Sequence, residues 1–193
     1  MDMLSQTSVI LDTVKVLAQG ETILYPTDTI WGLGCDATNA DAVEKIYALK
    51  QRDHSKSMLI LCADIEMVNR FVSSVGDDVR GFLLCEERPT TVIMPLKESL
   101  LALNLAAADG TIGVRIPQMD FCQQLLRRFG KPIVSTSANF SGMPSPASFA
   151  DIDEALRRRV CYCVPSSIEE QSGGHSSRIV KVVDDGEVTV IRK

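Results

Sequence analysis

Apolar residues follow two patterns along the chain. Segments with a helical period alternate with short continuous apolar runs. Residues 8–19 place Ile10, Val14 and Leu17 on one helical face, and Gly20 follows where a helix commonly ends. The same pattern, with capping and stop signals, predicts further helices at 41–50, 64–71, 77–85, 120–129 and 151–159.

Short apolar runs between these helices predict strands. Residues 58–62 form a continuous run whose length suits a strand buried on both faces. Two runs flanking an Asp-Asp-Gly turn at 184–186 predict a terminal hairpin. The strands expected are 22–25, 58–62, 91–94, 111–116, 132–135, 179–183 and 188–191. Helices and strands alternate from end to end, and this alternation predicts an α/β fold.

Length and composition narrow the class of protein. A chain of 193 residues with 45% apolar and 23% charged residues is typical of one globular domain, which we expect to span residues 1–193. No apolar stretch approaches the ~20 residues that cross a bilayer, and the N-terminus lacks the features of an export signal. We therefore expect a cytoplasmic protein with no membrane association. Six scattered cysteines are expected to be buried reduced thiols.

The formal net charge of -5 argues against a protein whose main role is to grip nucleic acid through its phosphates. Any anion site should therefore be local. Within this acidic chain, one short segment is rich in basic residues, and a solvated surface is the alternative explanation for it. The segment contains Lys45, Lys50, Arg52, His54 and Lys56.

A second candidate is the hydroxyl-rich segment 135–142, which directly follows a predicted strand. Its side chains suit phosphate oxygens, although they equally suit turn and helix capping. A P-loop, a Gly-x-Gly-x-x-Gly fingerprint and a nucleophile elbow are all missing from the sequence. The residues alone thus predict an anion site made of Lys50, Arg52 and the loop 135–139. The polar segment 165–177 is a candidate mobile lid.

Four motifs in order resemble the YrdC/Sua5 family of threonylcarbamoyl-AMP synthases, in its short single-domain form. They are Tyr25-Pro-Thr-Asp-Thr-Ile-Trp-Gly-Leu-Gly34, Lys50-Gln-Arg52, Thr111-Ile-Gly-Val-Arg-Ile-Pro117 and Ser135-Thr-Ser-Ala-Asn-Phe-Ser-Gly142. The resemblance spans about residues 20 to 192. It implies an open, twisted, mixed and mainly parallel sheet with flanking helices and a concave basic groove.

The resemblance also implies roles for individual residues. The family's Lys-x-Arg and Ser-x-Asn signatures fall on Lys50, Arg52, Ser137 and Asn139, which are the expected catalytic residues. Trp31 stands where the family usually has tyrosine. The ATP site is expected to comprise these four residues with Thr111, Ser145 and Arg192. The threonine site is expected to comprise Thr27, Arg115, Ser135 and Ser177.

The implied activity is a nucleotidyl transfer. L-Threonine, bicarbonate and ATP, with Mg²⁺ on the ATP phosphates, would give threonylcarbamoyl-AMP and pyrophosphate. A downstream transferase would use this product to form threonylcarbamoyladenosine in tRNA, and contact with tRNA or double-stranded RNA is an associated expectation. The main alternative is an RNA-binding translation or ribosome-maturation factor without catalysis. A carbamoyl-transfer domain and an ATP-binding regulator are further alternatives.

Overall fold

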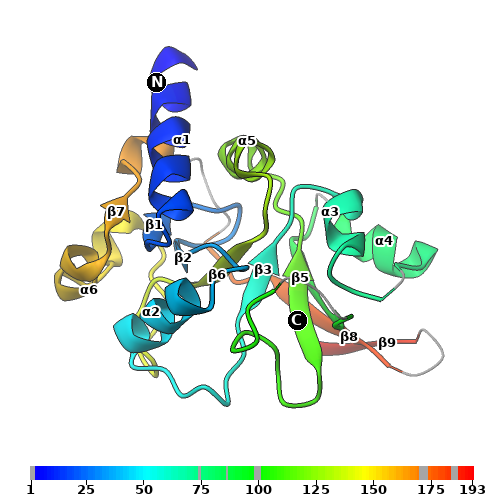
Figure 1. The fold of residues 1–193 in the computed structure, drawn as a ribbon. Helices are drawn as coiled ribbons and strands as arrows, with labels where there is room; N and C mark the ends of the chain where they lie inside the picture. Colours follow the sequence, from blue (N-terminus) through cyan, green and yellow to red (C-terminus); the bar gives the residue numbers. More distant parts are fainter. Residues whose placement is uncertain (1–2, 74, 86, 98–100, 170–173, 184–186) are drawn as a thin grey trace.

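The computed structural model describes residues 3–193 apart from residues 74, 86, 98–100, 170–173 and 184–186 (Figure 1). Each predicted helix has a counterpart, and only α5 has the predicted bounds. Helices α1 and α5 pack against each other, and Figure 1 shows them together at the top of the view. The helices are α1 (Met3–Ala18), α2 (Ala40–Lys50), α3 (Ile65–Asn69), α4 (Asp77–Leu83), α5 (Asp120–Phe129) and α6 (Glu154–Arg159), with 3-10 helices η1 (Phe149–Asp151) and η2 (Ser166–Ile168).

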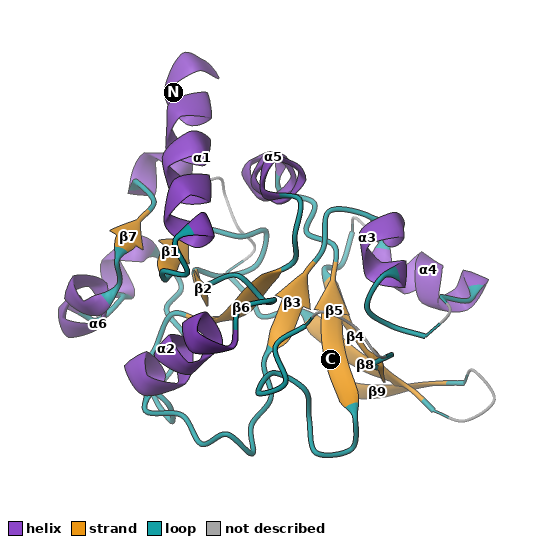
Figure 2. Cartoon of the chain, viewed as in Figure 1, coloured by secondary structure: helices purple, strands orange, loops and turns teal. Residues whose placement is uncertain are grey.

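The strands form one twisted sheet that crosses the molecule from β7 on the left to β8 and β9 on the right (Figure 2). Their order in the sheet is β7-β1-β2-β6-β3-β5-β4-β8-β9. The strands are β1 (Ile23–Tyr25), β2 (Gly32–Gly34), β3 (Leu59–Leu61), β4 (Thr90–Pro95), β5 (Thr111–Arg115), β6 (Ile133–Ser137), β7 (Tyr162–Cys163), β8 (Arg178–Val182) and β9 (Val188–Arg192).

The expected α/β class and mixed sheet are confirmed. The pairs β1–β7, β3–β5 and β4–β8 are parallel. The pairs β1–β2, β2–β6, β3–β6, β4–β5 and β8–β9 are antiparallel, so the parallel share among the described strands is smaller than the resemblance implies. The two strands of the expected terminal hairpin pair as predicted, and its turn at 184–186 lies outside the described residues.

Local capping chemistry explains where several helices begin and end. The Asp64 carboxylate accepts a 2.8 Å hydrogen bond from the Met67 amide at the start of α3, as an N-cap residue does. Asn39 caps α2 in the same way. Gly130 ends α5 with a positive φ of 73°, a conformation that costs glycine little. Asp64 and Gly130 are two of the signals from which helix boundaries were predicted.

Strand β2 was not predicted, because residues 27–34 were expected to be a loop. Gly32 and Gly34 instead lie in the sheet between β1 and β6. A Cβ on Gly34 would lie 2.6 Å from the Val134 carbonyl oxygen and 2.7 Å from Cε1 of Tyr25. Glycine is therefore needed here so that the Tyr25 ring can pack against the backbone, and the glycines mark close approach rather than a turn.

The hydrophobic core is formed by side chains from both the strands and the helices, and it includes the predicted inward residues Val43, Ile46 and Tyr47 of α2. The expectation for the cysteines is only partly correct, because Cys161 is exposed while Cys35, Cys62 and Cys122 are buried. None of the six cysteines, all of which the structure describes, forms a disulfide. Among the helices that the structure describes, none is long and apolar enough to span a membrane.

The packing at Gly34 gives a stability prediction. Gly34→Ala should lower the free energy of unfolding by about 1 to 3 kcal/mol, because the new methyl group overlaps a backbone oxygen and a buried ring. Gly81→Ala in α4 is the matched control, since nothing lies within 4 Å of its Cβ position. It should raise stability by about 0.5 to 1 kcal/mol. Urea unfolding measures both, and equal effects would contradict the close approach.

Candidate functional site

One cavity of about 280 Å³ lies where the loop 27–32 and residues 57–59 face strands β4, β5 and β6 and the start of β8. This volume is near the lower end of the roughly 300–1,000 Å³ typical of ligand pockets. Residues from widely separated parts of the sequence line it. The predicted site residues on its wall are Thr27, Arg52, Arg115, Ser135, Ser137, Ser145, Ser177 and Arg192.

The charge of this wall is entirely positive among the described residues that line it. Arg52, Arg115 and Arg192 are its charged side chains, and the other polar residues are serines and threonines. Burial lowers the pKa of Arg52, and burial together with the charge of Arg115 lowers the pKa of Arg192. Guanidinium groups remain charged at neutral pH despite such shifts, so the cavity concentrates positive charge inside an acidic protein.

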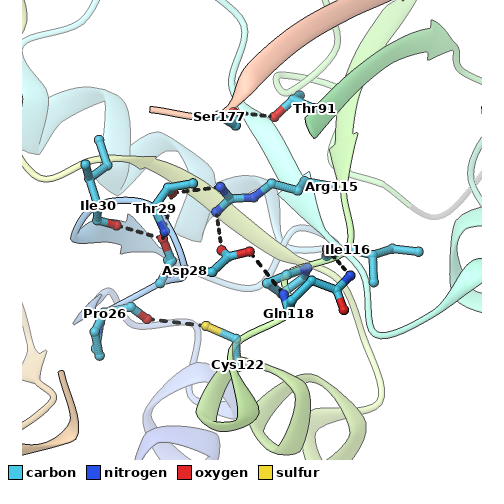
Figure 3. A network of polar contacts seen from close by, with 12 residues as sticks. Pro26, Asp28, Thr29, Ile30, Thr91, Arg115, Ile116, Gln118, Cys122 and Ser177 are labelled. Atoms are coloured by element: carbon cyan, nitrogen blue, oxygen red, sulfur yellow. Dashed lines mark hydrogen bonds and ion pairs between the residues drawn. The ribbon is translucent and has the colours of Figure 1, made fainter. Parts of the chain in front are cut away.

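Arg115, at the end of β5, reaches across to the loop 27–30 (Figure 3). Its Nη1 donates a 2.7 Å hydrogen bond to Oγ1 of Thr29, and its Nη2 lies 3.4 Å from Oδ1 of Asp28. Thr27 donates its own hydroxyl proton to the Ile30 carbonyl oxygen at 2.7 Å. The Thr29 hydroxyl must therefore donate to Thr27 across their 2.9 Å contact, which leaves it free to accept from Arg115.

This network restricts what Thr27 can do. Its hydroxyl donates to Ile30 and accepts from both the hydroxyl and the amide of Thr29. A hydroxyl has one proton and two lone pairs, so all three are in use. Direct recognition of a ligand by the Thr27 hydroxyl would therefore require this loop to rearrange.

On the opposite wall, Arg192 and Ser177 are joined. Arg192 donates to the Ser177 carbonyl oxygen through Nε at 3.0 Å and through Nη2 at 2.6 Å. The Ser177 hydroxyl lies 2.8 Å from that of Thr91 on β4. These contacts hold the last strand of the chain against the cavity and leave the Nη1 group of Arg192 without a partner among the described residues.

Arg52 is fixed by the segment that follows it. Its Nε donates to the Lys56 carbonyl oxygen and its Nη2 to that of Ser57, both at 2.9 Å. The chain reverses at Gln51, which has a positive φ of 51° and so ends α2. Helix α2 and its cap thereby place a single guanidinium group on the cavity rim.

Lys50 lies behind the cavity wall rather than on it, with 1% of its surface exposed. Its ammonium group donates to the carbonyl oxygens of Ser137 and Asn139 and, at 3.4 Å, to Oδ1 of Asn139. An ammonium group has three N–H bonds, so these contacts use all of them. Lys50 and Asn139 were expected to contact a ligand, and the structure places them together as a unit that holds the turn after β6.

Thr111 also lies off the cavity wall. It lines a neighbouring hollow that shares Ser57, Ile93 and Gly113 with the cavity, and its hydroxyl donates to Asp109 at 2.6 Å. Thr111 thus lies next to the cavity, in a hollow that is bounded in part by the same residues.

Sequence reasoning missed several residues of this wall. Thr29, Thr91 and Trp31 line the cavity, and Trp31 donates a 2.6 Å hydrogen bond to the Glu169 carboxylate while its ring lies 4.9 Å from that of Phe149. The hydroxyl-rich composition of residues 27–31 was the available signal for the loop. The candidate lid 165–177 contributes Ser176 and Ser177, and its residues 170–173 lie outside the described part.

The geometry suits a ligand with more than one anionic group. Guanidinium groups at separate points of one cavity bind carboxylates and phosphates in bidentate fashion, and the surrounding hydroxyls supply neutral hydrogen bonds. Within the described residues there is no cluster of three His, Cys, Asp or Glu side chains that would form a metal site.

Comparisons with known proteins show which family and fold the chain is similar to. The family model Sua5/YciO/YrdC, described as "Telomere recombination", matches residues 15–193. Threonylcarbamoyl-AMP synthase of Photobacterium profundum is 32% identical over 187 residues, which are 93% of this chain and 96% of the relative. A protein of the same name from Bacillus subtilis is 30% identical over 181 residues, which are 91% of this chain and 51% of the relative.

Solved structures share the fold. The structure of the H234A/Y235A variant of P. abyssi Sua5 has a TM-score of 0.85 at 22% identity and covers 97% of this chain, which spans 56% of that protein. E. coli YciO has a TM-score of 0.76 at 24% identity and covers 97% of this chain and 89% of its own. Another P. abyssi Sua5 structure was determined in complex with L-threonine.

The burial of Lys50 predicts a pH-dependent stability. Desolvation, and then the charge of Arg52, lower the pKa of Lys50 to about 7 from the ordinary 10.5. Between these values the unfolded chain binds more protons than the folded chain, so the stability contributed by Lys50 rises with pH. The free energy of unfolding of the wild type relative to Lys50→Met should increase above about pH 7 by at most about 1.4 kcal/mol per pH unit.

Urea unfolding of both proteins, at several pH values from about 7 to about 9, measures this difference. A difference that stays constant over this range would show that Lys50 keeps an ordinary pKa, and a difference that falls would equally contradict a lowered pKa.

Proposed function

The chain belongs to the Sua5/YciO/YrdC family, and from this premise we propose that it is a threonylcarbamoyl-AMP synthase. It would convert L-threonine, bicarbonate and ATP into threonylcarbamoyl-AMP and pyrophosphate. The single observation that carries the proposal is the convergence of Arg52, Arg115 and Arg192 on one cavity without a lining carboxylate among the described residues. An amino acid and a triphosphate together present the anionic groups that such a wall would neutralise.

We assign the two substrates to different parts of the wall. Arg115 would pair with the carboxylate of threonine, and Ser135, Ser177 and the Thr27 methyl group would contact the rest of that substrate. Arg52 and Arg192 would hold the phosphates. The hydroxyls of Ser137 and Ser145 would add hydrogen bonds to ATP, and Thr111 would meet the part of the nucleotide that extends into the neighbouring hollow.

The reaction needs positioning and charge neutralisation rather than a covalent nucleophile. The threonine amine and bicarbonate give a carbamate with loss of water. One carbamate oxygen then attacks the α-phosphorus of ATP in line with the departing pyrophosphate. Holding the two reactants in line lowers the entropic barrier, and fixed guanidinium groups stabilise charge that develops on the phosphates. Mg²⁺ would enter bound to ATP and share this charge.

In this scheme Lys50 and Asn139 act on the shape of the site. By fixing the carbonyl oxygens of residues 137 and 139, Lys50 sets the direction of the turn that carries the Ser137 hydroxyl. Loss of Lys50 would thus displace a group that contacts the nucleotide.

The product would serve a transferase that forms threonylcarbamoyladenosine in tRNA. The product contains a mixed anhydride between carbamate and phosphate, which is an activated group. A second enzyme would use this group in the next step. The main alternative, a non-catalytic RNA-binding factor, would bind RNA with an affinity that falls steeply with salt. The acidic net charge of -5 weighs against that alternative.

The enzyme proposal predicts a strict substrate requirement. Pyrophosphate should be released from ATP with Mg²⁺ when both L-threonine and bicarbonate are present, and omission of either should abolish it. An enzyme-coupled pyrophosphate assay measures the rate. Release that is independent of threonine, or no release under any condition, would count against the proposal.

The assigned cations predict the effect of single substitutions. Arg52→Ala and Lys50→Ala should each lower kcat/KM by the equivalent of about 1.5 to 3 kcal/mol, the scale of a charge-assisted hydrogen bond. Lys56→Ala is the matched control, because Lys56 contributes only its backbone oxygen to Arg52 and its side chain is exposed. Its kcat/KM should stay within about two-fold of wild type. Unchanged turnover in the first two variants would refute their roles.

A further inference from the structure

Asp28 lies directly behind the cavity and is not one of the residues that line it. Its side chain is 11% exposed and lies 3.4 Å from Nη2 of Arg115 through Oδ1 (Figure 3). The other carboxylate oxygen, Oδ2, accepts a 3.0 Å hydrogen bond from the backbone amide of Gln118. Oδ1 has no hydrogen-bond partner among the described residues, so its one close electrostatic partner is the guanidinium group.

The polar contacts that orient Arg115 all come from one loop. Its side chain is 4% exposed, and its two terminal nitrogens face Thr29 and Asp28 of the same loop. The Nε group is buried and has no hydrogen-bond partner among the described residues. The Thr29 hydroxyl donates to Thr27, which donates to the Ile30 carbonyl oxygen, so Thr29 accepts the hydrogen bond from Nη1. The contact at Nη2 depends on Asp28 alone.

A buried guanidinium group in this place needs a counter-charge. Arg115 shares the cavity wall with Arg52 and Arg192, which repel it. A buried cation that loses its partner is strongly unfavourable, and it relieves this cost by moving. Among the described acidic residues, Asp28 is the one in ion-pair contact with Arg115.

We propose that Asp28 is a positioning residue, which holds the Arg115 guanidinium in the orientation that receives the carboxylate of the amino-acid substrate. This inference rests on the proposed function, because it needs Arg115 to bind that carboxylate. It adds a residue that touches neither substrate and that acts through Arg115. The role is specific to the amino-acid end of the cavity, so the phosphate end should not depend on Asp28.

Asp28→Asn removes the charge and keeps the shape of the side chain. Isothermal titration calorimetry with L-threonine and with L-threoninamide, which lacks the carboxylate, separates positioning from general stability. The affinity of the variant for L-threonine should fall about ten-fold or more, the scale of a lost charge-assisted contact. Its affinity for L-threoninamide should stay within about two-fold of wild type, and its KM for ATP should not change.

Asp36→Asn is the matched control. Asp36 is also a buried aspartate in an ion pair, 2.7 Å from Nζ of Lys131, and it lies off the cavity wall. It should lower the melting temperature without changing the preference for L-threonine over L-threoninamide. If Asp28→Asn does not fold, Asp28→Ser, which leaves room for a water molecule, should show the same loss of preference.

The outcomes separate this inference from the proposed function. A wild-type protein that does not bind L-threonine would overturn both. A wild type that binds L-threonine, with a variant that keeps the full preference over L-threoninamide, would overturn the role of Asp28 alone. A parallel loss of affinity for both ligands would likewise reduce Asp28 to a structural ion pair.

Discussion

Mutual repulsion between three guanidinium groups is the constraint around which this site is built. Arg52, Arg115 and Arg192 come from the end of α2, from β5 and from β9, which are far apart in the sequence, and they face one cavity of about 280 Å³. Like charges that face one cavity destabilise the folded chain unless each is held and partly neutralised. The structure meets this requirement with carbonyl oxygens at Arg52 and Arg192 and with a hydroxyl and a carboxylate at Arg115.

The sheet supplies the rigidity that these contacts need. Arg115 ends a strand that pairs with both β3 and β4, and the Ser137 turn ends a strand held by β2 and β3. Lys50 then ties α2 to that turn through three hydrogen bonds. The arginine side chains are thus ordered when the protein folds. Binding of a triphosphate and an amino acid would therefore not have to include the entropic cost of ordering them.

Much of the fold was predictable from local signals, because caps and periodicity act within one turn or strand. Helix α5 has its predicted bounds for this reason. Strand β2 was missed because Gly32 and Gly34 favour a loop in isolation, and only contact with Tyr25 explains them. The site residues likewise divide into those that local sequence motifs predict and those that only tertiary contacts explain. The motifs indicated the residues, but side-chain direction depends on tertiary contacts, so the burial of Lys50 and the ion pair of Asp28 had no sequence signal.

We propose that one arginine-lined cavity holds both substrates at once. Trp31 is the one tryptophan of the chain and lines this cavity, so its fluorescence reports occupancy directly. Titration with Mg²⁺-ATP and with L-threonine, each alone and then in the presence of saturating amounts of the other, measures this. The account predicts that each ligand changes the emission and that the second still binds after the first. Mutual exclusion, or no response to either ligand, would contradict it.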